Sequence, residues 1–231
     1  MERRLAAILL TDMVGYSRLI GLDEEGTIAR QKSHREGIID PKISAHGGRI
    51  VKTTGDGILV EFPSVVEAVQ CAIAVQEEMA ACEADVPAER RIYYRIGINL
   101  GDVIIDGDDI FGDGVNVAAR LEGLAKPGGI CISGTVHDQL PGKLDSAFED
   151  AGEQTVKNIT RPVRIWHWKT DAPQDVRPEK VLPDKPSIAV LPFVNMSGDP
   201  EQAYLADGIA EDILTGLARV RWLVVTSRNS S

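Results

Sequence analysis

Apolar and polar residues follow one another along this chain in blocks whose period changes between that of a strand and that of a helix. Residues 5–10 form an aliphatic run typical of a buried strand. Residues 16–46 have a helical period that is interrupted near 21–25 and that contains Pro41. Gly47-Gly48 then provides a C-terminal stop, so the first strand is followed by a long helical segment.

A tight hairpin comes next. Residues 49–54 and 57–62 read as two strands that meet at Gly55-Asp56, residue types that tolerate unusual backbone angles. Ser64 and Glu67 form a capping box, which opens an amphipathic helix that ends near residue 85. Beyond it the pattern predicts strands at 93–100 with an extended continuation at 103–105, a polar loop at 106–114, a helix at 115–125, a strand at 130–133, a brief helix to about 140 and a strand at 163–168.

This order of elements predicts the fold class. Strands that alternate with helices and include one tight hairpin are typical of an α/β (α+β) layered sheet of the ferredoxin-like βαββαβ type, with helices packed on it. An all-parallel sheet would not contain the hairpin. We therefore expect one domain over residues 1–170.

The composition changes after this region. Residues 171–186 are rich in Pro, Asp, Lys and Glu without periodicity, which is typical of an exposed linker. A strand at 187–193, a helix at 200–219 and a strand at 222–226 would follow. One strand-helix-strand unit cannot bury both faces of a sheet, so we expect residues 187–231 to be part of a truncated domain.

Composition and charge exclude several classes of protein. The chain has 231 residues, 43% of them hydrophobic, which is enough for one sizeable core. A formal net charge of −10 argues against nonspecific binding to nucleic acid or to an anionic membrane. No apolar run approaches the roughly 20 residues of a spanning helix, and the three cysteines lack the spacing of a zinc site. We expect a cytoplasmic protein with reduced thiols.

Two aspartates stand where predicted elements end. Asp12 follows the first strand, and Asp56 lies at the hairpin tip. If the strand and the hairpin are neighbours in one sheet, both carboxylates reach the same edge and could bind divalent cations that hold nucleotide phosphates. The alternative is that Asp12 caps the next helix and Asp56 merely suits a turn. The run from Met13 to Ser17 contains Gly15 at the mouth of a helix, where backbone amides can face a phosphate.

Three blocks of sequence, in this order, resemble the signature blocks of class III adenylyl cyclases. They are Thr11-Asp12-Met13-Val14-Gly15-Tyr16-Ser17, Val51-Lys52-Thr53-Thr54-Gly55-Asp56-Gly57, and Asp109-Ile110-Phe111-Gly112 through Asn116-Val117-Ala118-Ala119-Arg120. The resemblance covers roughly residues 5–168. It implies the class III nucleotidyl cyclase fold and two Mg²⁺ or Mn²⁺ ions held by Asp12 and Asp56, with help from the Met13 carbonyl. It also implies that the amides of Val14, Gly15, Tyr16 and Ser17 meet the β- and γ-phosphates.

The resemblance also assigns base recognition. Lys52 and Asp109 would select the purine, since adenine offers a ring-nitrogen acceptor to an ammonium and an amine donor to a carboxylate. Guanylyl cyclases often have Glu and Cys at these two positions, so the pair favours ATP over GTP. Without the neighbouring blocks, Lys52 would pass for a solvated strand lysine and Asp109 for a loop carboxylate.

Further site residues follow from the same resemblance. Asn116 and Arg120 are four residues apart and share one helix face. In the family the matching Asn positions the ribose and the matching Arg stabilises charge on the α-phosphate. Alone, Arg120 beside Glu122 would read as a surface salt-bridge residue. Lys157 falls near a phosphate-binding lysine of the family, although Asn158 stands where glycine is commoner.

The implied activity is an adenylate cyclase that converts ATP to 3′,5′-cyclic AMP and pyrophosphate. The ribose 3′-oxygen attacks the α-phosphate in line, assisted by two metal ions. The family builds each site across a head-to-tail dimer, so a homodimer would have two sites. Three alternatives remain open: a guanylate cyclase, a non-catalytic nucleotide-binding sensory or regulatory module of the same fold, and a diguanylate cyclase or polymerase-like palm.

The last residues carry a second resemblance. Ser187-Ile188-Ala189-Val190-Leu191-Pro192-Phe193 and Tyr204-Leu205-Ala206-Asp207-Gly208 resemble the TolB-like amino-terminal segment that follows the cyclase domain in some bacterial proteins. This resemblance implies that a further region follows and contacts a regulatory partner.

Overall fold

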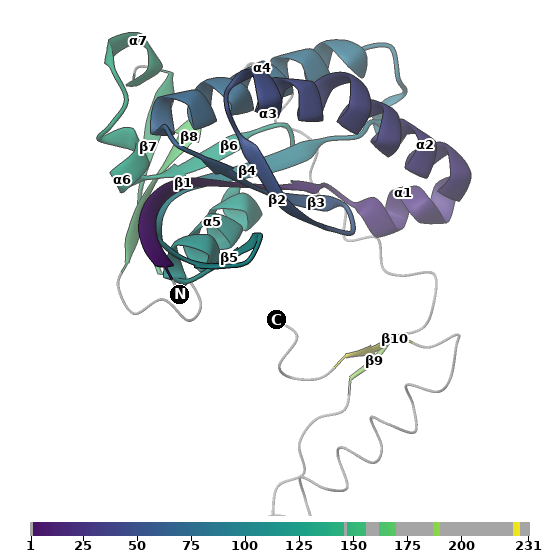
Figure 1. Ribbon diagram of the computed structural model, residues 1–231. Coiled ribbons are helices and arrows are strands. Elements are labelled where there is room, and N and C mark those ends of the chain that lie inside the picture. Colours follow the sequence, from purple (N-terminus) through teal and green to yellow (C-terminus); the bar gives the residue numbers. More distant parts are fainter. Residues whose placement is uncertain (1, 146, 156–161, 170–186, 190–223, 227–231) are drawn as a thin grey trace, which may run out of the picture. The chain divides into compact units, whose positions relative to one another are not determined.

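The computed structural model describes residues 2–145, 147–155, 162–169, 187–189 and 224–226. The chain divides into two compact units, Met1–Val176 and Arg177–Ser231. The larger unit contains almost all of the described residues, including those of the three signature blocks (Figure 1). The site is therefore built within this unit.

An eight-stranded sheet forms the centre of the larger unit. Its strands are β1 (Glu2–Met13), β2 (Arg49–Thr54), β3 (Gly57–Phe62), β4 (Tyr94–Asp106), β5 (Asp109–Phe111), β6 (Ile130–Ser133), β7 (Phe148–Gln154) and β8 (Val163–Trp168). The order is β2-β3-β1-β4-β6-β8-β7, and β5 pairs with β4. β1 pairs antiparallel with β3 on one side and with β4 on the other, and β2 pairs antiparallel with β3. The predicted βαββαβ arrangement is confirmed.

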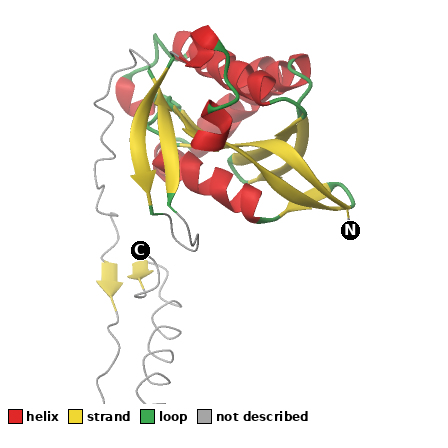
Figure 2. Ribbon diagram, turned by 90° about the vertical axis from the view of Figure 1, so that its left-hand side faces the viewer, coloured by secondary structure: helices red, strands yellow, loops and turns green. Residues whose placement is uncertain are grey.

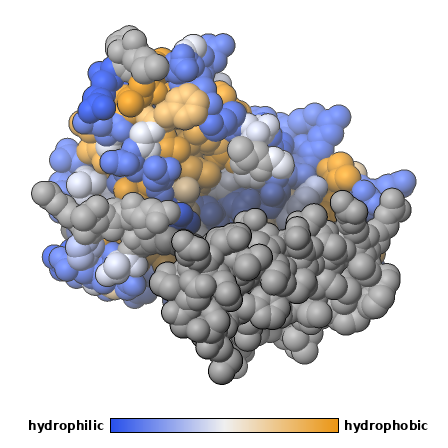
Figure 3. Space-filling model, turned by 90° about the horizontal axis from the view of Figure 1, so that it is seen from below, coloured by the Kyte–Doolittle hydropathy of each residue, from blue (hydrophilic) through white to orange (hydrophobic). Residues whose placement is uncertain are grey.

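Helices cover both faces of this sheet (Figures 1 and 2). One face carries α1 (Tyr16–Leu22), α2 (Glu24–His34), the π-helix η1 (Arg35–Ile39), α3 (Asp40–Ala45) and α4 (Val65–Cys82). The other carries α5 (Asp113–Leu124). Shorter helices are η2 (Ala88–Arg90), α6 (Gly134–His137) and α7 (Gly142–Asp145). Figure 3 views the unit from below, where apolar side chains gather in one region bordered by polar residues.

The period of β1 divides the core into two layers. Ala7, Leu9 and Met13 pack into the cluster that includes α3 and α4. Ala6 and Ile8 point the other way, into the cluster under α5. Because successive side chains of a strand alternate between faces, one fully apolar strand can serve both layers. This is why the aliphatic run does not alternate with polar residues: both faces of β1 pack against core residues.

The long helical segment contains a π-helix that the sequence pattern did not predict. Between α2 and α3 the helix widens to a π-helix, in which the Asp40 amide donates to the Arg35 carbonyl five residues earlier. Pro41 follows at the start of α3. A proline ring clashes with the carbonyl four residues before it and cannot donate a hydrogen bond. The π turn is a recognised way to insert one extra residue, and here it lets the helix continue through Pro41 to Ala45.

Three predicted boundaries differ from the structure. The strand predicted at 93–100 and its extended continuation at 103–105 form one strand, because β4 runs unbroken through Gly101. Gly101 is instead a point of close approach, where an added Cβ would lie 2.9 Å from the Cα of Gly114 in α5. The predicted loop at 106–114 contains β5, and the prediction missed β7. The exposed and partly polar side chains of β7 do not have the apolar signal of a buried strand.

The smaller unit is described at two short strands, β9 (Ser187–Ala189) and β10 (Val224–Thr226), which pair in parallel. They fall within two of the predicted strands. The predicted helix at 200–219 and the predicted linker at 171–186 lie outside the described residues. Among the residues that the structure does describe, no helix has the length and apolar character needed to cross a bilayer.

Candidate active site

The structure brings Asp12 and Asp56 together. In the β1–β3 ladder Thr11 pairs with Ile58, so Asp12 continues toward the hairpin turn that contains Asp56. Partial burial raises the pKa of Asp56, and the charge and hydrogen bond of Asp12 raise it further. The Asp12 carboxylate is therefore an immediate neighbour of the Asp56 carboxylate. Two hard oxygen ligands with mutually repelling charges fit a divalent cation, which would relieve the repulsion.

Met13 contributes its backbone to the same place. Its backbone lies close enough to the Asp56 carboxylate to lower the pKa of Asp56, which opposes the rise caused by burial. The N–H and C=O of one residue in an antiparallel strand point to the same side. The Met13 carbonyl is therefore directed toward the Asp56 side of β1, where the predicted metal ligand has to lie.

Arg95 is a site residue that the sequence prediction missed. It is directly opposite Asp12 in the β1–β4 ladder, and its guanidinium lies 3.4 Å from the Asp12 carboxylate. The available signal was a permanent charge inside a mainly apolar strand. A half-buried cation beside Asp12 lowers the cost of holding a carboxylate charge at this sheet edge.

Glu122 is the second partner of Arg95. Its carboxylate lies 2.8 Å from the Arg95 Nε and is 12% exposed. Burial raises the pKa of Glu122 to about 7, against the attraction of Arg95. Gly97 permits this approach, since an added Cβ there would lie 2.2 Å from the Glu122 backbone nitrogen. Helix α5 therefore packs against β4 closely enough to bring Glu122 beside the metal-site candidates.

The loop after β1 contains the residues whose amides are predicted to meet the phosphates. Gly15 has a left-handed backbone, φ 67°, and precedes α1. Tyr16 and Ser17 are the first helical residues, whose amides have no carbonyl partner within the helix. The amide of Val14, however, donates to the Tyr93 carbonyl at 2.8 Å. This hydrogen bond ties the loop to the start of β4. The contact of the Val14 amide with a phosphate stays a prediction.

The predicted purine-selecting residues are in direct contact. Lys52 on β2 donates to the Asp109 carboxylate on β5 at 2.7 Å, and this hydrogen bond lowers the pKa of Asp109. The Lys52 ammonium also lies 5.0 Å from the centre of the Phe111 ring, which is within range of a cation–π interaction. Phe111 is 47% exposed. A charged pair with an exposed aromatic ring can offer both hydrogen bonds and an apolar surface to a base.

Asn116 and Arg120 are exposed on α5. Their spacing places both side chains on one face of this helix. Lys157, the remaining predicted phosphate ligand, lies outside the described residues. Met13, Asp12 and Asp56 thus make one group, and Lys52 with Asp109 makes another. In the part of the chain that the structure describes, no hydrogen bond or ion pair joins the two groups.

One cavity of the larger unit contains neither group. It has a volume of about 670 Å³ and is lined by residues of β4, α5, α6 and β8, among them Asn99, Gly114, Thr135 and Trp166. The two groups of candidate residues are surface features of this chain. Within the described residues they are two separate groups on this chain.

Comparison with known proteins agrees with this geometry. Residues 4–169 match the family described as "Adenylate and Guanylate cyclase catalytic domain". The match covers more than half of the chain, so this chain belongs to the class III adenylate and guanylate cyclase catalytic domain family. The family resemblance of the three sequence blocks is thereby confirmed.

Individual relatives support the same assignment. The chain is 52% identical over 237 residues to "Putative adenylate cyclase 3" of Rhizobium meliloti (strain 1021); the alignment covers 100% of this chain and 40% of that protein. The chain thus spans about two fifths of this relative. A solved structure described as adenylate/guanylate cyclase/hydrolase from Silicibacter pomeroyi is 51% identical with a TM-score of 0.67, over 74% of this chain and 99% of that one.

A more distant structure belongs to the guanylyl cyclase Cya2. It is 28% identical with a TM-score of 0.60, over 72% of this chain and 92% of that one. These structures confirm the predicted class III cyclase fold. The family match ends at residue 169 and does not describe the rest of the chain, so the TolB-like resemblance stays a prediction.

Proposed function

We propose that this chain is the catalytic region of an adenylate cyclase, which converts ATP to 3′,5′-cyclic AMP and pyrophosphate at the interface of a homodimer. The observation that carries the proposal is the meeting of Asp12 and Asp56 at one sheet edge. These residues are 44 positions apart in sequence, and a turn or a cap alone would not require their contact. Membership of the cyclase family supports the reaction type.

Asp12, Asp56 and the Met13 carbonyl would hold two Mg²⁺ or Mn²⁺ ions. Such ions, when bound, acidify the ribose 3′-hydroxyl and neutralise the charge of the triphosphate. The chain's own groups would do the rest of the binding. The amides of Gly15, Tyr16 and Ser17 can donate to phosphate oxygens from the mouth of α1.

Lys52 and Asp109 would orient the base. Their mutual hydrogen bond keeps the ammonium and the carboxylate side by side in the absence of a nucleotide. An ammonium and a carboxylate so placed match the acceptor and the donor of adenine, whereas guanine presents a carbonyl oxygen to the position of the carboxylate. This pair supports ATP as the substrate, as does the name of the relative from Rhizobium meliloti, a putative adenylate cyclase.

Asn116 and Arg120 would act on the sugar and on the α-phosphate. Asn116 would position the ribose, and the permanently charged Arg120 would stabilise negative charge that grows during attack on the α-phosphate. Lys157 would bind the phosphates from the same subunit. Because these side chains face outward on α5, they would serve the metal-binding aspartates of the partner, and the head-to-tail homodimer would contain two sites.

The test is an assay for cyclic nucleotide with Mn²⁺ and either ATP or GTP. We expect cyclic AMP as the main product and a loss of at least 100-fold for Asp56→Asn, since one metal-binding carboxylate contributes several kcal/mol to the transition state. Asp85→Asn, which changes an exposed carboxylate in the turn after α4, is the matched control and should keep wild-type turnover. Cyclic GMP as the main product would contradict the substrate, and full activity of Asp56→Asn would contradict the metal assignment.

A further inference from the structure

Arg95 is shared between two carboxylates that belong to different parts of the site. Its guanidinium lies 3.4 Å from Asp12 on β1 and 2.8 Å from Glu122 on α5. The closer partner, Glu122, is also the more buried one, at 12% exposure against 32% for Asp12. A single cation therefore sits between a candidate metal ligand and a carboxylate for which the proposed reaction has no use.

Helix α5 presents different residues to different sides. Asn116 and Arg120 lie on its exposed face. Glu122 is two residues beyond Arg120, about 200° further around a helix with 3.6 residues per turn, and it faces β4. The close packing at Gly97 fixes the distance from Glu122 to Arg95. The same helix thus contributes to both half-sites of one chain.

Asp12 cannot serve Arg95 and a divalent cation equally. A guanidinium competes for the carboxylate oxygens and repels a cation placed beside it. If Arg95 moved away from Asp12 and had no second partner, its own half-buried charge would be unpaired, which is costly. Glu122 offers that second partner at a distance shorter than that to Asp12.

We propose that Glu122 is a positioning residue for the metal site: it holds the Arg95 guanidinium off Asp12 and thereby sets the concentration at which divalent cations bind. This inference rests on the proposed function, because it takes Asp12 and Asp56 as the metal ligands. It requires no contact between Glu122 and the metal or the nucleotide.

The experiment measures Mn²⁺ binding to the whole chain without nucleotide, from the electron paramagnetic resonance signal of free Mn²⁺. Glu122→Gln releases Arg95 to Asp12, and we expect the Mn²⁺ dissociation constant to rise roughly tenfold. Arg95→Gln removes the competing cation, and we expect binding at least as tight as in the wild type. The double variant should bind like Arg95→Gln, because Glu122 acts only through Arg95.

A merely structural role for Glu122 predicts a different pattern. If Glu122 only packs α5 against β4, the double variant should bind Mn²⁺ as weakly as Glu122→Gln or more weakly, and this result would overturn the inference. Wild-type affinity in Glu122→Gln would overturn it too. Arg95→Gln tests the inference even if Glu122→Gln does not fold, since weaker binding than in the wild type contradicts competition. Glu77→Gln, at an exposed position of α4, is the control for loss of one surface charge.

Asp56→Asn separates this inference from the proposed function. If Asp56→Asn binds Mn²⁺ as well as the wild type, the metal assignment fails and the inference falls with it. If Asp56→Asn loses binding while Glu122→Gln keeps it, only the role of Glu122 is rejected.

Discussion

Asp56 illustrates how much of the site a single residue's sequence context reveals. Its place at the tip of a hairpin, together with the end of the first strand at Asp12, predicted two carboxylates at one edge, and the ladder between β1 and β3 brings them there. Lys52 and Asp109 were paired only through the family resemblance, and the structure places them in direct contact. Asp12 and Asp56 could be singled out from the pattern itself because each stands where a predicted element ends.

Other site features depend on contacts that no local pattern records. Arg95 becomes a neighbour of Asp12 only through the β1–β4 register, which pairs these two residues although they are 83 positions apart in sequence. Glu122 reaches Arg95 only because Gly97 lets a helix approach a strand. The same register lets the Val14 amide donate to the Tyr93 carbonyl. Sequence periodicity predicts which face a residue occupies, but the partner across the sheet is set by the tertiary fold.

The purine pair supplies a prediction at this scale. Exchanging Lys52→Glu together with Asp109→Cys removes the ammonium and the carboxylate that match adenine. We expect the ratio of kcat/KM for ATP to that for GTP to fall by roughly 10- to 100-fold, because mismatched hydrogen-bonding groups would then face adenine. Steady-state assays with both nucleotides measure this ratio. Lys126→Gln, which changes an exposed cation after α5, should leave it unchanged, and an unaltered ratio in the double variant would rule out the base-selecting role.

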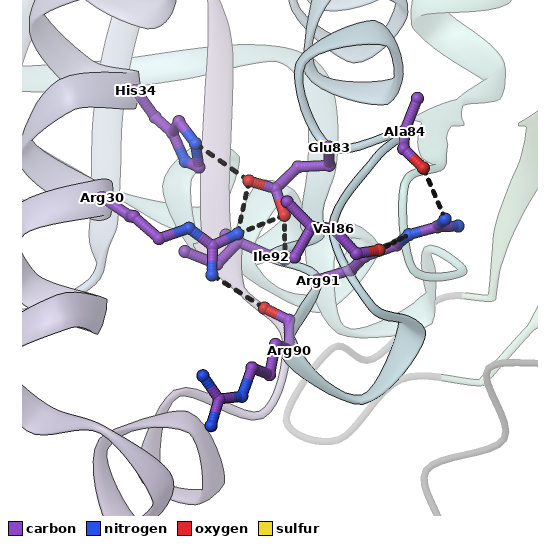
Figure 4. A network of polar contacts seen from close by, with 8 residues as sticks. All are labelled: Arg30, His34, Glu83, Ala84, Val86, Arg90, Arg91 and Ile92. Carbon is purple, nitrogen blue, oxygen red and sulfur yellow. Dashed lines mark hydrogen bonds and ion pairs between the residues drawn. The ribbon is translucent and has the colours of Figure 1, made fainter.

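At the scale of elements, the helical segment is tied to the sheet by a buried network around Glu83 (Figure 4). The Glu83 carboxylate, 4% exposed, accepts from both Arg30 and the Ile92 amide and lies 3.1 Å from the His34 Nε2. Arg30 also donates to the Arg90 carbonyl at 2.9 Å. This network joins α2, the end of α4 and the approach to β4, the strand that carries Arg95.

The network is structural in character. His34, Cys82 and Glu83 place possible metal-ligating atoms within 4.8 Å of one another. Arg30 already contacts both oxygens of the Glu83 carboxylate, and its charge would repel a metal ion. A buried carboxylate that is neutralised by a guanidinium needs no further cation.

The pKa of Glu83 gives a prediction for stability. Burial alone would raise this pKa, but hydrogen bonds from His34 and Arg30 outweigh it and lower the pKa to about 2, from 4.5 in the unfolded chain. The folded state therefore gains stability above pH 4.5 and loses it as the pH falls toward 2. Glu83→Gln should lower the free energy of unfolding at pH 7 by roughly 3 kcal/mol.

Urea unfolding of both proteins at pH 7, 4 and 3 measures the effect. The difference between wild type and Glu83→Gln should shrink at pH 4 and again at pH 3, and a difference that stays constant would show that Glu83 acts through packing alone. Glu78→Gln is unsuitable as a control because Glu78 pairs with Lys42. Glu77→Gln, on the same helix and exposed, should be within about 0.5 kcal/mol of the wild type at every pH.

The elements that escaped prediction share a cause. Strand β5 has only three residues and lies in a polar stretch, and β7 has an exposed and partly polar surface. Both exist because a neighbouring strand, β4 or β8, offers its backbone groups for pairing. Edge strands of this kind are specified by their neighbours more than by their own hydrophobic pattern. The central strands, which are apolar on both faces, were predicted correctly for the converse reason.

At the scale of the whole molecule, the separation of the two residue groups is the feature that matters. Asp12 and Asp56 lie at one edge of the sheet, whereas Lys52, Asp109, Asn116 and Arg120 belong to surfaces that no described contact joins to that edge. The proposed function joins the two groups by pairing two copies of the chain, so that each site uses one group from each copy. Under this proposal activity is a property of the dimer, and the contribution of each copy is separable by mutation.

The most direct test of this account is complementation between two inactive variants. Asp56→Asn would disable the metal half of the site and Arg120→Gln the other half, and each alone should lack cyclase activity. Co-expression in equal amounts should restore about a quarter of the wild-type activity, because half of the dimers are mixed and each contains one intact site. A mixture that stays inactive, although mass measurement shows mixed dimers, would contradict a site built across two subunits.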